Sequence, residues 1–421
     1  MTAWIKMGMR NLVKNGRRSV ITTFAIAMAF ATVNLFDGFA SYMHHGNQNV
    51  AIYAQGSGHL AIFKRGFLEK GRMEPGKYLL SNADLETIKA ICGEIGGVEL
   101  AAPQLFITGL LSNGRVSTIF VAQGIVPSQR AIFLSYLAKM AENSPKKMSD
   151  RIEGGPLLDE KDFGVGVSRG LANLLGFKLN EDAVAMGNTA EGQMNALDAQ
   201  ILMIFNAGSE QMNDKLMLVP LAFAQSLYDW QGADRVAILL KDTKRTDEMR
   251  DKLTAALAAK GIDADIKTWV EMSEWYRKVK SMFDTIFQFL FVIVFIIVVM
   301  SVVNTMGMAV MERTREIGTL RAMGLRQGGV LHLFAVESVL LGIFGSIVGL
   351  VLTSVGWGIV KLLKPMWTPP GLSNKFVIWI EWVPSTLVFT TVFLMVLCLI
   401  ASLLPARRAA RQNIVDALGH V

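Results

Sequence analysis

The chain has 421 residues, of which 52% are hydrophobic and only 18% are charged, and its formal net charge is +7. Because soluble globular domains carry about a quarter charged residues, this composition excludes a disordered chain and indicates a membrane protein. The two cysteines, Cys92 and Cys398, are too few for a disulfide-stabilised scaffold.

Four apolar stretches are long enough to cross a bilayer. A hydrocarbon core of ~30 Å requires about 20 helical residues, and we expect membrane-spanning helices over residues 19–41, 283–311, 330–360 and 383–404. The first stretch follows two arginines, as a signal peptide would. It is longer than the roughly 7–15 residues of a signal-peptide core, so we expect it to remain as an anchor.

Basic residues gather in three segments beside these stretches, residues 1–18, 312–329 and 405–421. The positive-inside rule predicts that all three are cytoplasmic. Residues 42–281 then form a large outer domain, and residues 361–382 form a short outer loop. The outer domain carries 27 basic and 28 acidic side chains, whereas the rest of the chain carries 15 and 7. The excess basic charge therefore faces lipid headgroups of the bilayer, and we expect no nucleic-acid partner.

The outer domain contains a predicted hairpin and a predicted helix. Apolar residues alternate over 105–112 and 116–123, around Asn113-Gly114-Arg115, which is typical of a β-hairpin. Residues 84–95 predict a helix with Asp84 at the N-cap position. The apolar face of this helix consists of Leu85, Ile88, Ile91 and Cys92.

Further elements of this domain are predicted as helices over 222–228 and 246–259 and a strand over 235–240. A stretch rich in Gly, Pro and Ser over 144–156 is interpreted as a boundary between two subdomains. Mixed helices and strands without a disulfide predict an α+β domain that is large enough to stabilise its own core.

One helix is predicted to run from Glu271 into the second apolar stretch. Apolar residues recur there at steps of three and four, and neither Pro nor Gly interrupts the run. Such a helix would be a stiff stalk between the outer domain and the membrane. Packing of the helix against its own domain explains the periodicity equally well.

No motif for chemistry is found. Residues 71–78 have nearly the spacing of a phosphate-binding loop, but Tyr78 stands where a Ser or Thr hydroxyl would hold Mg²⁺, and Pro75 lacks a backbone N–H. We therefore expect no nucleotide site, no catalytic residue, no metal site and no cofactor in this chain. The five histidines lack the spacing of a zinc site, and we expect a surface or membrane-interface position for His44, His45, His59, His332 and His420.

Glu337 lies about seven residues into the third apolar stretch, where an ionised carboxylate is costly and usually faces protein or water. We favour an inter-helix hydrogen bond over a proton relay, because no second carboxylate and no lysine is suitably placed. Gly342, Gly345 and Gly349, with Ser346, form a small-residue face suited to close helix packing.

Residues 311–324 read MERTREIGTLRAMG and predict a short amphipathic helix with alternating charge. Ile317, Leu320 and Met323 are expected to be available to a groove on a partner protein. This stretch strongly resembles the coupling segment of the FtsX/MacB/LolC-like permeases of type VII (mechanotransmission) ABC transporters. The basic entry segment with Arg10-Asn11-Leu12, and the run of residues 337–342, are also similar to that family.

The resemblance implies an α-helical membrane protein with four transmembrane helices and a large α+β periplasmic domain of the MacB type, in a bacterial inner membrane. Both termini would be cytoplasmic. The residues that the resemblance assigns to ATPase coupling are Glu312, Arg313, Thr314, Arg315, Glu316, Ile317, Gly318, Leu320 and Arg321. Glu337, with the three glycines, would serve helix packing.

The resemblance also implies partners. ATP and Mg²⁺ would be bound by a separate cytoplasmic ABC ATPase dimer, and a second permease copy or a paralogue would complete the membrane part. The resemblance is also compatible with a periplasmic or outer-membrane partner. We expect that charge reversal at Arg313 and Arg315 uncouples ATP hydrolysis from function while the chain still folds and inserts.

Three functions stay open at this point. Residues 56–62 are similar to the opening strand of the LolC/LolE branch, which implies export or release of lipoprotein-like or amphipathic substrates. An FtsX-like signalling complex that activates a cell-wall hydrolase is the alternative, although the outer domain exceeds what that branch usually carries. A membrane-anchored sensor without an ATPase is the third.

Overall fold

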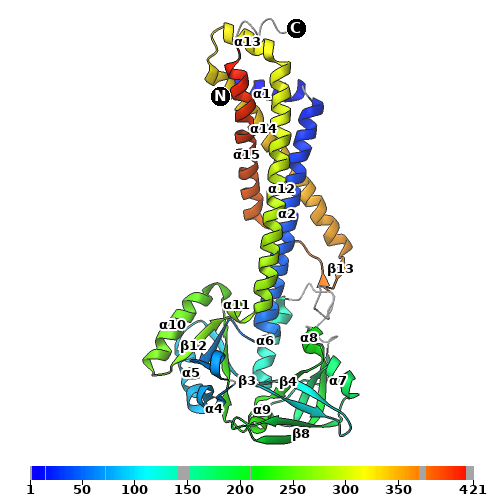
Figure 1. The fold of residues 1–421 in the computed structure, drawn as a ribbon, viewed down its shortest axis with the longest axis vertical. Helices are drawn as coiled ribbons and strands as arrows, with labels where there is room; N and C mark the ends of the chain where they lie inside the picture. Colours follow the sequence, from blue (N-terminus) through cyan, green and yellow to red (C-terminus); the bar gives the residue numbers. More distant parts are fainter. Residues whose placement is uncertain are drawn as a thin grey trace. The chain divides into compact units, whose positions relative to one another are not determined.

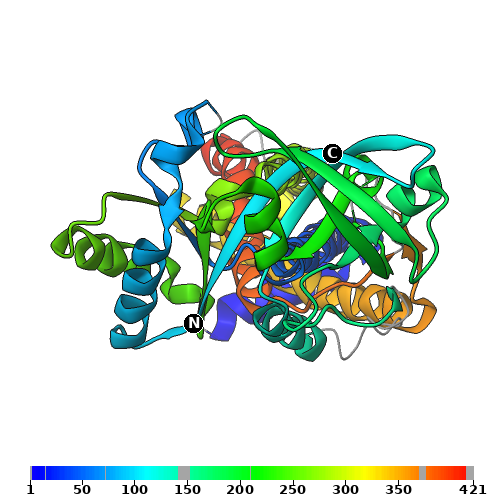
Figure 2. The same cartoon turned by 90° about the horizontal axis from the view of Figure 1, so that it is seen from below.

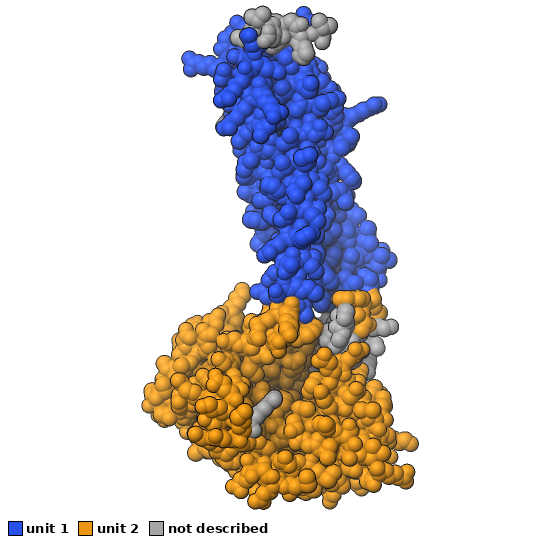
Figure 3. All heavy atoms as spheres, in the orientation of Figure 1, with its two compact units in different colours: residues 1–44, 279–365, 378–421 blue, residues 45–278, 366–377 orange. Residues whose placement is uncertain are grey.

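A computed structural model of the chain describes residues 2–14, 16–71, 73–140, 152–208, 210–368 and 376–413. The chain forms two compact units, which are drawn in different colours in Figure 3. The helical unit comprises residues 1–44, 279–365 and 378–421, and the mixed unit comprises residues 45–278 and 366–377. Each unit is described by itself.

Four helical segments in the described part of the chain are long and apolar enough to cross a membrane, which confirms the four predicted spans (Figure 1). They are α2 (Gly16–Asn49) with its π-helical continuation η1 (Val50–Ala54), α12 (Glu274–Glu312), α14 (Gln327–Leu363) and α15 (Pro384–Arg411). Each is longer than the apolar stretch that predicted it, because polar turns extend the helix at its ends.

Shorter elements flank these helices. They are α1 (Thr2–Lys14), α11 (Trp269–Met272), α13 (Thr314–Ala322) and the strand pair β13 (Met366–Trp367) and β14 (Phe376–Val377). The helix predicted to run from Glu271 begins three residues later, at Glu274. Glu271 instead closes a capping box with Thr268 at the start of α11, and Ser273 is non-helical.

The interior of the helical unit is built from all four long helices. Their buried apolar side chains form one cluster, which includes Phe30 of α2, Val302 of α12, Phe334 of α14 and Leu397 of α15. A hydrogen bond of 2.5 Å between the Thr22 and Thr305 hydroxyls joins α2 to α12, and one of 2.9 Å between the Ser338 and Ser402 hydroxyls joins α14 to α15. We infer that the helices pack as one bundle rather than as independent spans.

The mixed unit is built on a ten-stranded mixed sheet with the order β12-β1-β11-β3-β4-β9-β6-β8-β5, in which β7 pairs with β3 and β8. Figure 2 shows the mixed unit from below, with strands coloured cyan to green along the sequence. The strands are β1 (Leu60–Lys64), β3 (Val98–Ser112), β4 (Ser117–Ile125), β5 (Ile152–Gly154), β6 (Gly164–Ser168), β7 (Asp182–Asn188), β8 (Met194–Phe205), β9 (Leu216–Pro220), β11 (Arg235–Leu240) and β12 (Ala264–Thr268). A small separate pair is formed by β2 (Leu80–Ser81) and β10 (Gly232–Ala233).

Helices cover this sheet. The helical elements of the mixed unit are α3 (Phe67–Lys70), α4 (Pro75–Tyr78), α5 (Asn82–Glu94), α6 (Pro127–Met140), α7 (Arg169–Leu175), α8 (Glu210–Asn213), α9 (Leu221–Tyr228), α10 (Thr246–Ala259) and the 3₁₀ turn η3 (Thr243–Arg245).

Strand β11 is buried on both of its faces. Val236, Ile238 and Leu240 face the cluster that contains α5 and α10, whereas Ala237 and Leu239 face the cluster that contains η1 and α6. Burial on both faces explains why this strand reads as an apolar run without period-two alternation.

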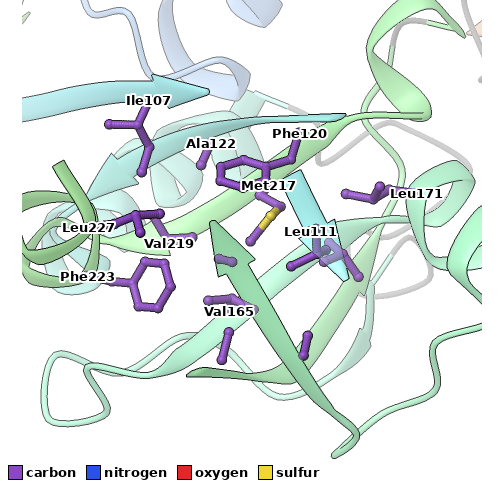
Figure 4. Close-up of a cluster of buried hydrophobic side chains, with 14 of the residues drawn as sticks. Ile107, Leu111, Phe120, Ala122, Val165, Leu171, Met217, Val219, Phe223 and Leu227 are labelled. Atoms are coloured by element: carbon purple, nitrogen blue, oxygen red, sulfur yellow. The ribbon is translucent and has the colours of Figure 1, made fainter. Parts of the chain in front are cut away.

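A second core lies where β3 and β4 continue towards β6, β7, β8 and β9, under α7 and α9. Figure 4 shows Leu111, Phe120, Val165 and Met217 converging there from four different strands. This core and the clusters on β11 lie along one continuous sheet.

Most predictions for this unit are confirmed. The hairpin is β3–β4, with Ser112 opposite Ser117, and the helices over 222–228 and 246–259 are α9 and α10. Asp84 was placed wrongly, because the N-cap is Ser81 and Asp84 occupies the N3 position of a capping box. The proposed boundary over 144–156 falls largely outside the described residues, since residues 141–151 are not described.

One histidine also differs from expectation. His59 is fully buried rather than at a surface. Its Nδ1 atom accepts the Leu240 N–H at 3.0 Å, and its Nε2 atom lies 2.9 Å from the Thr243 hydroxyl. Burial lowers the pKa of His59 to about 4, and the nearby Asp242 carboxylate only partly opposes this. The ring is therefore neutral at physiological pH. His420 lies outside the described residues.

Candidate coupling site at the α12–α13–α14 junction

The coupling segment, residues 312–321, lies at a double turn between two long helices. The residue that separates α12 from α13 is Arg313, whose backbone leaves the helical range at φ −112 and ψ 13. After α13, Gly324 adopts φ +100, a conformation that favours glycine, and α14 starts at Gln327. Glycine at this position therefore lets the chain reverse within a few residues.

The Arg313 side chain points into the helical unit. Its Nη1 atom donates to Glu337 Oε1 at 2.7 Å, and the two side chains are 7% and 3% exposed. A buried ion pair of this kind holds its two elements together firmly, because separating the partners leaves an uncompensated charge out of water. The pair thus ties the start of the coupling segment to α14.

A third element meets the same carboxylate. Asn11 Nδ2 of α1 also donates to Glu337 Oε1. The carboxylate of Glu337 therefore joins α1, the α12–α13 junction and α14 at one point. The predicted hydrogen bond of Glu337 to another helix is therefore made with an arginine and an amide. The sequence analysis had considered only a lysine or a second carboxylate as partners.

Two exposed ion pairs link the coupling segment to the N-terminal region. Lys14 Nζ lies 3.0 Å from Glu316 Oε1, and Arg18 Nη1 lies 2.5 Å from Glu312 Oε1. All four side chains are at least 41% exposed, so each pair contributes at most about 1 kcal/mol. One pair reaches α13 and the other reaches the last residue of α12, and both contribute little compared with the buried contacts of this segment.

The predicted coupling residues divide between two faces of α13. Arg313, Thr314, Ile317 and Gly318 are buried against the helical unit. Arg321 is partly buried, and its Nη1 atom donates to the Gln412 carbonyl after α15. The expectation that Ile317 is available to a partner is therefore wrong: Ile317 is 3% exposed and belongs to the core of the helical unit.

The opposite face of α13 is open. Glu312, Arg315 and Glu316 are exposed, Leu320 is partly exposed, and Met323 just after the helix is 72% exposed. Since Glu312 and Glu316 already pair with the N-terminal region, the free part of this face consists of Arg315, Thr319, Leu320 and Met323. We call these four residues the open face.

The small-residue face of α14 lies against two neighbouring helices. A Cβ atom added to Gly345 would lie 2.4 Å from Ile26 Cγ2, and one added to Gly349 would lie 2.6 Å from Phe30 Cβ. At Gly342 the nearest atom would be the Met395 Cα atom, at 3.2 Å. The glycines therefore sit where α2 and α15 approach α14 closely.

The arrangement suits mechanical linkage between helices rather than catalysis. Glu337 is engaged by its two donors, and among the described residues no group of three or more His, Cys, Asp or Glu side chains could hold a metal ion. What the site can do is convert a displacement of α13 into a displacement of α12, α14 and α1, because one carboxylate joins all of them.

Sequence reasoning missed the roles of Asn11, Lys14 and Arg18. These residues were noticed only as part of a basic entry segment, and their partners lie about 300 residues away along the chain. The single carboxylate of the third span, Glu337, was the signal that could have pointed to these partners, because a buried charge requires a partner of opposite sign.

Comparisons with known proteins include one family model that covers this part of the chain. Residues 288–414 match the family model described as FtsX-like permease C-terminal. The chain is 24% identical to the lipoprotein-releasing system transmembrane protein LolC of Neisseria meningitidis, over 99% of both chains. It is 30% identical to the macrolide export ATP-binding/permease protein MacB of Chromobacterium violaceum, over 49% of this chain and 31% of that protein.

Among solved structures, the periplasmic region of MacB from Actinobacillus actinomycetemcomitans aligns with a TM-score of 0.35 and 12% identity, covering 51% of this chain and 89% of that one. The family match includes the whole coupling segment, α14 and α15, and the resemblance that the coupling segment suggested is confirmed. The chain is an FtsX-like permease, an ABC transporter permease of the type that includes LolC and MacB.

Proposed function

We propose that this chain is the permease subunit of a transporter driven by a separate cytoplasmic ABC ATPase, and that the open face of α13 is the surface to which the ATPase binds. The observation that carries this proposal is the division of α13 into two faces. One face is fixed to the helical unit through Arg313 and Ile317, and the other presents Arg315 and Met323 without a partner among the described residues.

A charged and apolar helix face of this kind suits a groove on a partner protein. Arg315 supplies a charge that can select an acidic counterpart, and Met323 supplies an adaptable apolar contact. The basic residues near α13 support a cytoplasmic position for this end of the helical unit, and the proposal puts both termini on the same side.

Motion would pass from the ATPase to the mixed unit through α12. This helix runs without interruption over 39 residues, about 58 Å at 1.5 Å per residue. Its first residues belong to the mixed unit and its last to the helical unit. A push on the open face would be carried by the buried Arg313–Glu337 pair into α14 and along α12 to the periplasmic side.

The cargo that we propose is a lipoprotein-like or otherwise amphipathic substrate, released or exported from the outer leaflet. The full-length similarity to a lipoprotein-releasing transmembrane protein supports this class. Among the described residues, α12 exposes mainly Phe, Ile, Val and Met, a surface that suits an amphipathic cargo better than a hydrophilic solute. A second permease copy or a paralogue would complete the membrane part.

Co-purification from native membranes in a gentle detergent tests this proposal. We expect an ABC ATPase together with lipoproteins. An ATPase together with a peptidoglycan hydrolase would replace the transport function by the signalling alternative, and recovery of the permease without any ATPase would contradict the proposal.

A further inference from the structure

Helix α1 presents three different stripes along its length. At 100° per residue, one stripe contains Trp4, Gly8 and Asn11, which contact α14. The Trp4 ring lies 5.5 Å from His332, a Cβ atom added to Gly8 would lie 3.0 Å from Leu340, and Asn11 donates to Glu337. This stripe fixes how α1 is rotated about its axis.

The second stripe is apolar and open. Ile5, Met9 and Val13 follow each other at steps of four residues and are 44%, 48% and 80% exposed. A row of three exposed apolar side chains on a helix indicates a surface that is covered by a protein or by the membrane. The open apolar surface continues at the start of α2, where Val20 and Ile21 are 66% and 69% exposed.

The third stripe is basic. Lys6, Arg10 and Lys14 also follow at steps of four, and they lie directly beside the apolar stripe on the helix surface. Lys14 is paired with Glu316, whereas Lys6 and Arg10 are exposed and make no ion pair with any described residue. Two cations therefore stand free next to an open apolar stripe.

The α14 residues that α1 contacts indicate whether α1 lies beside the bilayer or in solvent. Its contacts on α14 run from His332 to Leu340, that is, from about 7 to 20 Å beyond the first residue of that helix. These positions lie in the first third of the third predicted span, residues 330–360, so we expect the border of the bilayer rather than open solvent beside α1.

We propose that α1 is an interfacial helix that binds anionic phospholipid. Ile5, Met9 and Val13 enter the acyl-chain region of the cytoplasmic leaflet, and Lys6 and Arg10 bind the phosphate groups of the lipids above them. An apolar stripe beside a basic stripe is the pattern of helices that lie in a membrane surface, and each lysine or arginine near an anionic surface adds attraction. This function does not depend on the identity of the ATPase or the cargo.

The experiment uses the full chain in vesicles of phosphatidylcholine containing phosphatidylglycerol. Nitroxide labels are placed by the single substitutions Val13→Cys and Lys6→Cys, and the native Cys92 and Cys398 are buried and so protected from labelling. We expect the label at position 13 to collide with oxygen and not with a water-soluble nickel chelate, and the label at position 6 to show the reverse. Nickel access at position 13 would overturn the proposal.

Lipid selectivity provides the second measurement. Phosphatidylglycerol retained by the purified chain is quantified for the wild type and for the double substitution Lys6→Gln/Arg10→Gln, which we expect to retain at least about threefold less. The charge-matched control is Lys161→Gln/Lys178→Gln, which removes two exposed lysines from the mixed unit and should retain as much as the wild type. Equal retention by the wild type and the α1 variant would overturn lipid binding, as would protection of position 13 only in the presence of a bound protein.

Discussion

Arg313 Nη1 and Glu337 Oε1 lie 2.7 Å apart, and both side chains are almost completely removed from the surface. The pair joins Arg313, near the start of the coupling segment, to the third span, and Asn11 adds α1 to the same carboxylate. Charge reversal at Arg313 would therefore damage folding as well as coupling. The sequence analysis assigned the same coupling role to Arg313 and Arg315, but Arg313 is buried and Arg315 is exposed. Arg315 is therefore the residue with which contact to a partner can be tested.

Removing one member of the buried pair should destabilise the helical unit. We expect Glu337→Ala to cost ~3–5 kcal/mol, because Arg313 keeps its charge without a partner. The apolar double substitution Arg313→Met/Glu337→Leu should recover most of that loss. Thermal unfolding of the detergent-solubilised chain measures both, with Lys14→Ala as a control that changes stability by at most about 1 kcal/mol. Equal effects of Glu337→Ala and Lys14→Ala would contradict the role of the pair.

Close packing at the α14 glycines gives a second prediction. Gly345→Ala should destabilise by ~1–3 kcal/mol, because its methyl group would overlap Ile26. Gly358→Ala is the matched control on the same helix, since nothing lies within 4 Å of its added Cβ atom. Better helix propensity should make that control neutral or more stable by up to about 1 kcal/mol. Thermal unfolding of the detergent-solubilised chain measures both variants. A destabilised Gly358→Ala together with an unaffected Gly345→Ala would contradict close packing at Gly345.

His59 should make the mixed unit sensitive to acid. Its pKa is about 4 in the folded chain and about 6.5 when unfolded, so below pH 6.5 the unfolded chain binds a proton that the folded chain does not. Stability should fall as the pH drops from about 6.5 to about 4 and level off below, by up to ~3 kcal/mol from this residue.

His59→Asn keeps an acceptor for the Leu240 N–H and removes the titration. Denaturant unfolding of the full chain, followed by tryptophan fluorescence at several pH values, should show a flatter profile for the variant. Identical profiles for the variant and the wild type over this range would show that burial of His59 is not the cause.

Arg130 of α6 caps the end of the first long helix. Its guanidinium donates to the Tyr53 and Ala54 carbonyls, and desolvation lowers the pKa of Arg130 to about 10, so it stays protonated at neutral pH. Gln104 and Gln123 donate to the next two carbonyls, at Gly56 and Gln55. Side chains of the mixed unit therefore satisfy four successive carbonyls.

Arg130→Ala should cost ~2–3 kcal/mol, because charged hydrogen bonds to two carbonyls are lost. Hydrogen exchange should become faster at the amides of residues 50–58. The exposed Arg115→Ala in the hairpin turn should leave both unchanged. Unaltered exchange in the Arg130 variant would mean that this guanidinium does not hold the helix end.

The four spans could be predicted because an apolar stretch of about 20 residues is rarely found in any structure other than a membrane-spanning helix. The hairpin around Gly114 and the helix α10 could be predicted for a related reason, since turn residues and local periodicity specify them. In these cases the information is contained within about 20 neighbouring residues.

The short helix of the coupling segment could be predicted from the sequence, but its orientation could not. An apolar face such as Ile317 and Leu320 is the same pattern whether it packs on a partner or on its own chain, and the structure places Ile317 in the core. Asn11 and Glu337 are 326 positions apart, so only the tertiary fold brings them together. His59 was missed because burial of a polar ring depends on partners from β11 and η3.

In the proposed mechanism, a separate ATPase binds the open face of α13 and drives the permease. The most direct measurement is ATPase co-purification and substrate-dependent ATP hydrolysis for the double substitution Arg315→Glu/Met323→Glu. The matched control is Arg115→Glu/Met194→Glu, which changes an exposed arginine and an exposed methionine of the mixed unit. We predict that the α13 variant unfolds at the wild-type temperature but loses at least about tenfold in ATPase binding, while the control is unaffected. Wild-type binding and coupling in the α13 variant would contradict the account.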